Sequence, residues 1–145
     1  MKRFAGLFVL LVGMAGLALA QSNVPTPVLP DSLRWTVSPN SQSLKSTWVL
    51  GAETKPGPYV FRVKIAANGR IPPHTHPDER NSTVLFGTIY VGFGEAFDED
   101  KVVAVPTGAI YVAPANVPHY IWAKDGDAEY QEVGVGPTAT VFLKL

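Results

Sequence analysis

The chain has 145 residues, 46% hydrophobic and 17% charged, a composition typical of a globular protein with one core rather than two. Its 12 basic and 12 acidic residues cancel, and no run of Lys or Arg is interleaved with aromatic residues, so we expect no nucleic-acid partner. The absence of cysteine excludes disulfides, thiol nucleophiles, cysteine-ligated metal and lipid attachment through a cysteine.

Residues 1–20 have the pattern of a secretory signal peptide. Lys2 and Arg3 precede a long apolar stretch that ends in Ala18-Leu19-Ala20, the small-x-small pattern that signal peptidases cut. The alternative is a transmembrane anchor, but the stretch is short for a bilayer span, contains glycines and leads directly into polar sequence. We therefore expect cleavage after Ala20 and a periplasmic or secreted bacterial protein, with no membrane anchor in the mature form.

Residues 21–43 predict an extended N-terminal leader, because prolines recur among small polar residues. From Leu44 onward, short β-rich runs are separated by Gly, Pro and Asp turn signals, and no helical periodicity is present. These runs are STWVL, YVFRVKIAA, TVLFGTIYVGF, KVVAV, AIYVAP, HYIWA, EYQEVGV and ATVFLKL. We expect residues 44–145 to form a single all-β domain, either a sandwich or a small barrel.

The run over residues 59–66 shows the alternation of a strand with one buried face. One face would carry Tyr59, Phe61, Val63 and Ile65. The other would carry Val60, Arg62, Lys64 and Ala66. Because successive side chains of a strand point to opposite faces, the first set is expected to face the core.

Two of the three histidines lie in the segment IPPHTHPDER, residues 71–80. In an extended strand His74 and His76 project from one face and Thr75 from the other, and the neighbouring prolines hold the backbone extended. His119 follows another proline at the start of an apolar run. A lone histidine is more often a hydrogen-bonded core or surface residue, but a same-face pair with a third histidine elsewhere favours a metal site.

Two motifs give the chain, from about Gly57 to Phe142, a resemblance to the cupins, a superfamily of small β-barrels. The first cupin motif is matched at Gly69, His74, His76 and Gly87. The second is matched at Gly108, Pro114, Asn116 and His119, with Asn116 in place of a glycine and Ala123 in place of the final Asn. Asn tolerates the left-handed conformation that glycine would supply. The resemblance implies an all-β, cupin-type jelly-roll β-barrel in which His74, His76 and His119 meet.

The acid of the first motif departs from the cupin pattern. Counted back from Gly87, the position of the metal-binding Glu holds Arg80, which cannot coordinate a cation, and Glu79 stands one residue earlier. A shift of one residue turns a strand side chain to the other face. Three outcomes follow: Glu79 reaches the metal through a bulge or loop, the site has three histidines, or metal binding is weakened. We favour three histidines, keep Glu79 as a fourth candidate ligand, and expect Asp78 to be a solvated turn residue.

Three histidine ligands would leave open positions on a divalent transition ion, and nitrogen ligands suit Fe, Mn, Ni, Cu or Zn better than Mg or Ca. Five aromatic residues near the motifs could line the pocket, although packing is the favoured role for each: Phe86, Tyr90, Tyr111, Tyr120 and Trp122. Arg62 and Arg80 could pair with an anionic substrate, although solvation at the surface is the favoured role for both.

Two hypotheses of function follow, and both include a small-molecule partner. The first is a small metalloenzyme, oxygenase-like or isomerase-like, in which the ion acts as a Lewis acid or oxygen binder. The second is a non-catalytic module that captures a small molecule or metal in the same pocket. An empty scaffold is a third alternative, since one fold hosts many activities. By analogy with cupins, the edge near Leu44 to Leu50 is a candidate surface for a homodimer.

Overall fold

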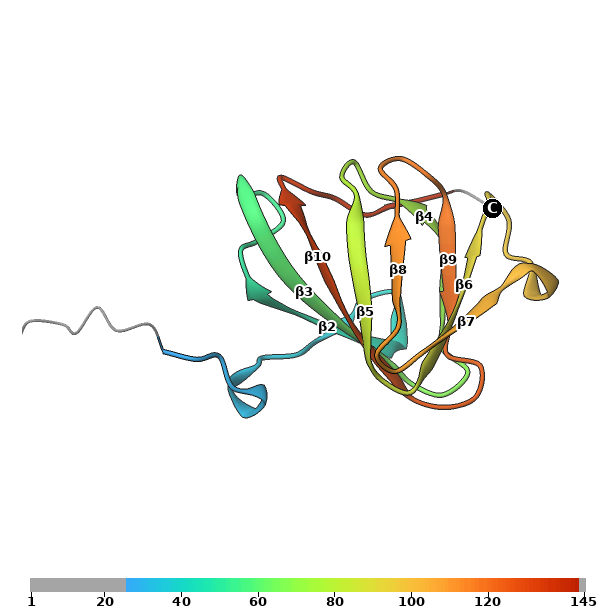
Figure 1. Ribbon diagram of the computed structural model, residues 1–145, viewed down its shortest axis with the longest axis horizontal. Coiled ribbons are helices and arrows are strands. Elements are labelled where there is room, and N and C mark those ends of the chain that lie inside the picture. Colours follow the sequence, from blue (N-terminus) through green and yellow to red (C-terminus); the bar gives the residue numbers. More distant parts are fainter. Residues whose placement is uncertain (1–25, 144–145) are drawn as a thin grey trace, which may run out of the picture.

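The computed structural model describes residues 26–143, which form two antiparallel sheets and two short 3₁₀ turns, Pro30–Ser32 and Glu99–Lys101 (Figure 1). The six-stranded sheet contains, in spatial order, β1 (Thr36–Ser38), β2 (Ser41–Leu50), β3 (Gly57–Ile65), β10 (Ala128–Gly136), β5 (Arg80–Phe86) and β8 (Ile110–Ala113). The five-stranded sheet contains β11 (Val141–Phe142), β4 (Arg70–Thr75), β9 (His119–Trp122), β6 (Thr88–Phe93) and β7 (Val103–Pro106).

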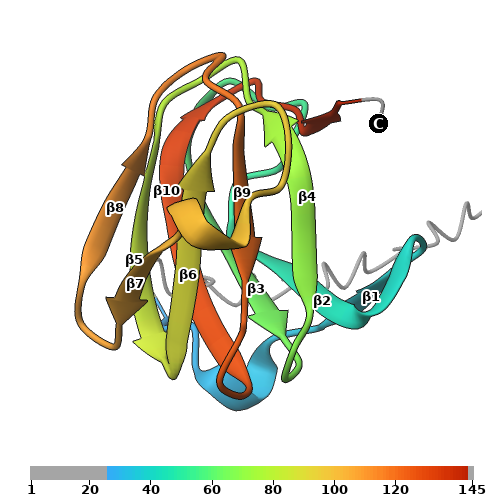
Figure 2. The ribbon, with the colours of Figure 1, turned by 90° about the vertical axis from the view of Figure 1, so that its right-hand side faces the viewer.

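The chain changes sheet at every strand from β3 to β6 and again from β7 to β10. This alternation, in which segments distant in sequence become neighbours, is the arrangement of a double-sheet jelly roll. In Figure 2 the five-stranded sheet faces the viewer and the six-stranded sheet lies behind it. Strand β11 pairs with the end of β4. The predicted all-β jelly roll is confirmed, as two packed sheets that are not joined into one closed barrel within residues 26–143.

Strand pairing begins before Leu44, where we placed the start of the folded domain. β1 lies within the predicted leader and pairs with the first half of β2, which itself begins at Ser41. Residues 26–35, by contrast, form only one 3₁₀ turn and no strand. The predicted signal peptide, residues 1–20, lies outside the described residues. Within the described part of the chain, no helix has the length and apolarity needed to cross a bilayer.

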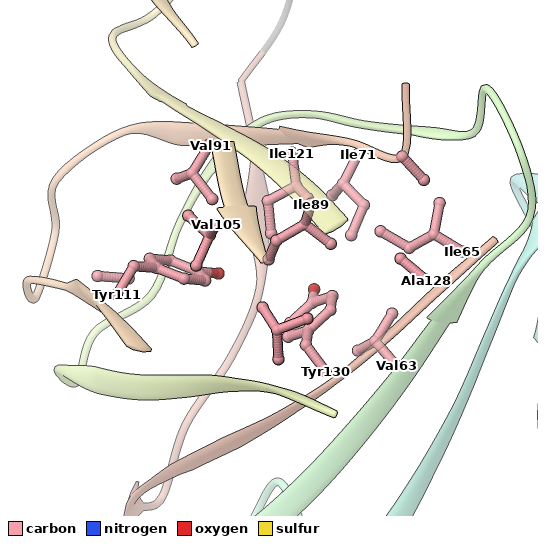
Figure 3. Close-up of a cluster of buried hydrophobic side chains, with 13 residues drawn as sticks. Val63, Ile65, Ile71, Ile89, Val91, Val105, Tyr111, Ile121, Ala128 and Tyr130 are labelled. Carbon is pink, nitrogen blue, oxygen red and sulfur yellow. The ribbon is translucent and has the colours of Figure 1, made fainter. Parts of the chain in front are cut away.

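The hydrophobic core lies between the sheets and draws side chains from both (Figure 3). Its members are Val63, Ile65, Ile71, Val84, Ile89, Val91, Val105, Tyr111, Ala113, Ile121, Ala123, Ala128 and Tyr130. The alternation predicted along β3 is present: Val63 and Ile65 are buried, Phe61 is half-buried and packs against this core, and Lys64 is exposed. The sequence pattern of apolar residues at every second position thus correctly identified the core face of β3.

Gly87 makes the turn from β5 in one sheet to β6 in the other. Its φ is +71°, and a Cβ there would lie 2.3 Å from the backbone oxygen of Asp127. Because both the conformation and the space exclude a side chain, Gly87→Ala should lower the free energy of unfolding by about 1–3 kcal/mol in urea denaturation. The matched control is Gly126→Ala, because a Cβ at Gly126 meets nothing within 4 Å. Equal stability of the two variants would contradict the prediction.

Candidate metal centre

The three histidines lie on or directly after two neighbouring strands of the five-stranded sheet. His74 is in β4 and His119 opens β9, and the two are direct cross-strand partners. The β4–β9 register shifts between Ile71 and His74, where two consecutive prolines lack the N–H groups that a regular ladder needs. His76 follows the end of β4 on the same face as His74, as predicted, and all three imidazoles are almost completely buried.

The three imidazole rings converge on one point. The ring centroids of His74 and His119 are 4.2 Å apart, those of His74 and His76 are 4.8 Å apart, and those of His76 and His119 are 5.1 Å apart. One potential ligand nitrogen from each ring lies within 4.8 Å of the other two. The structure therefore brings together the three histidines that the sequence singled out, in an arrangement able to hold one metal ion.

Backbone carbonyls fix the tautomer of each ring. Nδ1 of His74 donates to the Pro72 oxygen at 2.8 Å, and Nδ1 of His119 donates to the Val117 oxygen at 3.1 Å. Nδ1 of His76 donates to the Ala139 oxygen at 2.9 Å. Since a carbonyl can only accept, each Nδ1 carries the proton and each Nε2 keeps its lone pair. Hydrogen bonds of this kind, from the second ring nitrogen to a carbonyl, orient the histidine ligands of metals.

The Nε2 atoms of His76 and His119 are buried and have no hydrogen-bond partner among the described residues. Unpaired buried polar atoms are costly, so they require an explanation such as an ion. A divalent transition ion fits this donor set, because it accepts neutral imidazole lone pairs and leaves coordination positions for another molecule.

Burial keeps the histidines neutral. It lowers the pKa of His74 to about 3, with a further contribution from His119, and it lowers the pKa of His76 to about 3, with a further contribution from the positive charge of Arg80. Burial also lowers the pKa of His119. All three rings are therefore unprotonated at neutral pH, the form required of a metal ligand.

These shifts predict that the metal-free protein loses stability in acid. Below the ordinary histidine pKa of 6.5 the unfolded chain binds protons that the folded chain, with pKa values of about 3 at His74 and His76, does not. The free energy of unfolding should therefore fall as the pH decreases from about 6.5 to about 3. Thermal unfolding should show a melting temperature at least about 5 °C lower at pH 5 than at pH 7.5.

His74→Gln provides the control for the acid prediction, because it removes one of the titrating groups. Its melting temperature should depend less steeply on pH over the same range. A flat profile between pH 7.5 and 5 in the original protein would contradict the prediction.

Comparison with known proteins places the chain in a family. Residues 61–134, about half of the chain, match the family described as a cupin domain. The chain belongs to the cupin family. The resemblance stated from the two motifs is thereby confirmed, and the left-handed conformation expected at Asn116 is present, with φ at +60°.

Curated relatives of this cupin include germin-like proteins of Oryza sativa subsp. japonica. Germin-like protein 5-1 is 32% identical over 68 residues, which are 45% of this chain and 30% of that protein. Germin-like protein 8-11 is 36% identical over 64 residues, which are 42% of this chain and 29% of that protein. The chain thus spans less than a third of the length of these relatives.

Solved structures share the cupin fold at low sequence identity. The polyketide cyclase RemF from Streptomyces resistomycificus has a TM-score of 0.70 and 16% identity, covering 84% of this chain and 87% of RemF. Salicylate 1,2-dioxygenase from Pseudoaminobacter salicylatoxidans has a TM-score of 0.58 and 12% identity, covering 72% of this chain and 30% of that enzyme. At these identities the likeness concerns the fold alone.

Glu79, the fourth candidate ligand, does not lie with the three histidines in the structure. Glu79 is exposed in the loop before β5 and is not part of the three-histidine group. Asp78, expected to be a solvated turn residue, is instead largely covered and accepts hydrogen bonds from the hydroxyls of Tyr59 and Thr138. Among the sequence-predicted ligands, the structure brings together only His74, His76 and His119.

Arg80 occupies the acid position and, contrary to our expectation of surface solvation, is buried with 4% of its side chain exposed. Its Nη1 donates to Glu132 Oε2 at 2.7 Å, and its Nη2 donates to Thr138 Oγ1 at 2.8 Å. Burial raises the pKa of Glu132, and the guanidinium of Arg80 opposes that rise. The pair is a buried ion pair. Arg62, also expected to be solvated, is half-buried and hydrogen-bonds to Gln131.

A cavity of about 180 Å³ adjoins the histidines. Its lining includes His74, His76, Arg80 and Glu132, together with Phe61, Tyr130 and Phe142. None of the five aromatic residues considered from the sequence lines this cavity; Tyr111, Tyr120 and Trp122 are buried as packing residues, as favoured, whereas Phe86 is exposed. Sequence reasoning missed Glu132 and Tyr130, although both occupy inward positions of an alternating run in β10.

Proposed function

We propose that this protein is an exported cupin that holds one divalent transition ion on His74, His76 and His119 and presents it to a small molecule. The convergence of three neutral imidazoles, each with Nδ1 bonded to a carbonyl and Nε2 left free, carries the proposal. Fe, Mn, Ni, Cu and Zn all suit nitrogen ligands.

We propose that the small molecule enters the cavity beside the histidines, and that the reaction is oxygenase-like or isomerase-like. A bound transition ion would supply Lewis-acid or oxygen-binding chemistry there. The chain's own residues would orient the molecule and exclude water, since Phe61, Tyr130 and Phe142 supply apolar walls. Cupin neighbours named as a polyketide cyclase and a dioxygenase support an enzymatic role, although the likeness to them shows the fold alone.

One observation favours a second candidate, a non-catalytic module that binds a small molecule or metal. Glu132 is the only carboxylate among the described residues that line the cavity, and it is already bound to Arg80. No unpaired carboxylate in this lining is therefore available as a general acid or base. Binding without turnover does not require such a group.

Elemental analysis of mature protein purified without a histidine tag tests the metal. We expect about one transition ion per chain and a rise in melting temperature when metal is returned to chelated protein. Oxygen-uptake and small-molecule conversion assays then separate the two roles, since only the enzyme shows turnover. Absence of metal together with no thermal response to added metal would overturn the metal site in both roles.

The proposed location and assembly are separate from the metal site. Export to the periplasm or outside the cell is supported by the pattern of residues 1–20, and N-terminal sequencing of the secreted form should begin at Gln21. The homodimer remains a prediction, which sedimentation of the mature protein would test.

A further inference from the structure

We infer that Arg80 makes the metal cavity selective for a small carboxylate. This inference rests on the proposed function and names its ligand class. It arises from the acid position of the first cupin motif, where this chain has Arg80. Arginine is a cation that can only donate hydrogen bonds, so the charge at this position is reversed.

Arg80 is close to the metal centre and is held rigidly. Its Nη2 and His76 Nδ1 donate to the same oxygen, that of Ala139, at 3.3 and 2.9 Å. Thr138 and Glu132 fix the rest of the guanidinium. A guanidinium held in this way keeps a fixed orientation, and a free donor on it can form a charge-assisted hydrogen bond to a carboxylate.

One donor of this buried side chain has no partner. Nε of Arg80 makes no hydrogen bond to the described residues, and the nearby Asp78 Oδ1 is 3.8 Å away. That carboxylate already accepts hydrogen bonds from Tyr59 and Thr138. Because 4% of the Arg80 side chain is exposed, this cation is buried, and the described residues do not use all of its hydrogen-bond donors.

The charge of the cavity also favours an anion. The three histidines are neutral ligands, so they leave the charge of a divalent ion uncompensated. Among the charged side chains of the lining, Glu132 and Arg80 offset each other's charge and Lys45 adds a positive charge, so the lining does not compensate the ion. Because an uncompensated buried charge is costly, a ligand that brings negative charge is favoured over a neutral one of the same shape.

The volume limits the size of this ligand. At about 180 Å³ the cavity is smaller than the roughly 300–1,000 Å³ typical of sites for drug-sized molecules. Apolar walls from Phe61, Tyr130 and Phe142 would accept a short hydrocarbon portion. A small organic acid combines the required charge, size and apolar part.

Titration of acetate into cobalt-loaded protein at pH 8, followed by calorimetry and by the visible absorption of Co²⁺, tests the inference. Acetate should bind at least about tenfold more tightly than acetamide, its neutral analogue. Arg80→Gln should weaken acetate binding about tenfold and Glu132→Gln should strengthen it, because the two changes alter the cavity charge in opposite directions. Glu79→Gln is the matched control, an exposed acid whose neutralisation should leave acetate affinity unchanged.

The outcomes separate the two proposals. If cobalt binds but acetate and acetamide bind equally, or Glu132→Gln and Glu79→Gln behave alike, the carboxylate inference is overturned and the metal centre stands. If the unsubstituted protein takes up no cobalt, the proposed function fails and this inference fails with it. Should Arg80→Gln not fold, the opposite-signed effect of Glu132→Gln still decides.

Discussion

Replacement of His119 by glutamine is expected to reduce metal content from about one ion per chain to a small fraction, with at least a roughly hundredfold loss of affinity. The expectation follows from the geometry, because His119 is the cross-strand partner of His74 and supplies one of three converging nitrogens. Loss of a group that hydrogen-bonds to a metal ligand commonly costs about 10–100-fold in metal affinity, so loss of the ligand itself should cost at least as much. Elemental analysis and competition with a chelator of known affinity would measure it.

Glu79→Gln is the control for the metal prediction, because it tests the acid that the sequence offered as a fourth ligand. Glu79 is exposed and outside the histidine group, so the variant should keep its full metal content. Circular dichroism of metal-free His119→Gln would establish that the β structure persists. Full retention of metal by His119→Gln, or loss of it by Glu79→Gln, would show that the ligand set is wrong.

The candidate metal centre was predictable in part, because some of its determinants are local in sequence. A same-face relation between His74 and His76 follows from the two-residue period of an extended strand. The left-handed conformation at Asn116 follows from the small set of residues that tolerate it. Placing His119 opposite His74 required the motif resemblance, since the pairing joins strands far apart in the chain.

The surroundings of the metal centre were less predictable because they depend on sheet pairing. Arg80 was expected at the surface, yet it shares the inward face of β5 with Ser82 and Val84. Its partner Glu132 lies 52 residues away, in the strand that pairs with β5. In each strand the sequence places a charged residue where the alternation predicts an inward-facing side chain, and this was a visible signal of a buried charge. Only the pairing of the two strands shows that the charges meet.

Disruption of this pair gives the largest expected change in stability. Arg80→Met should lower the free energy of unfolding by about 3–5 kcal/mol, because it leaves the Glu132 carboxylate buried without its partner. Replacing both residues, as in Arg80→Met with Glu132→Leu, removes both charges at similar volume and should recover most of that loss. Urea denaturation of the metal-free single and double variants measures both effects as a double-mutant cycle.

Glu129→Gln serves as the control for this cycle, because Glu129 lies in the same strand but faces Arg62 and Lys64 at distances of 3.8 and 3.6 Å. Such partly exposed pairs contribute about 0–1 kcal/mol, so the variant should be nearly as stable as the original protein. The prediction is contradicted if Arg80→Met lowers the free energy of unfolding no more than Glu129→Gln does. It is also contradicted if the effects of the Arg80 and Glu132 substitutions simply add in the double variant. Either result would mean that the two charges do not depend on each other. The interior of this cupin would then tolerate an isolated carboxylate, which is possible only if water reaches it or a proton neutralises it.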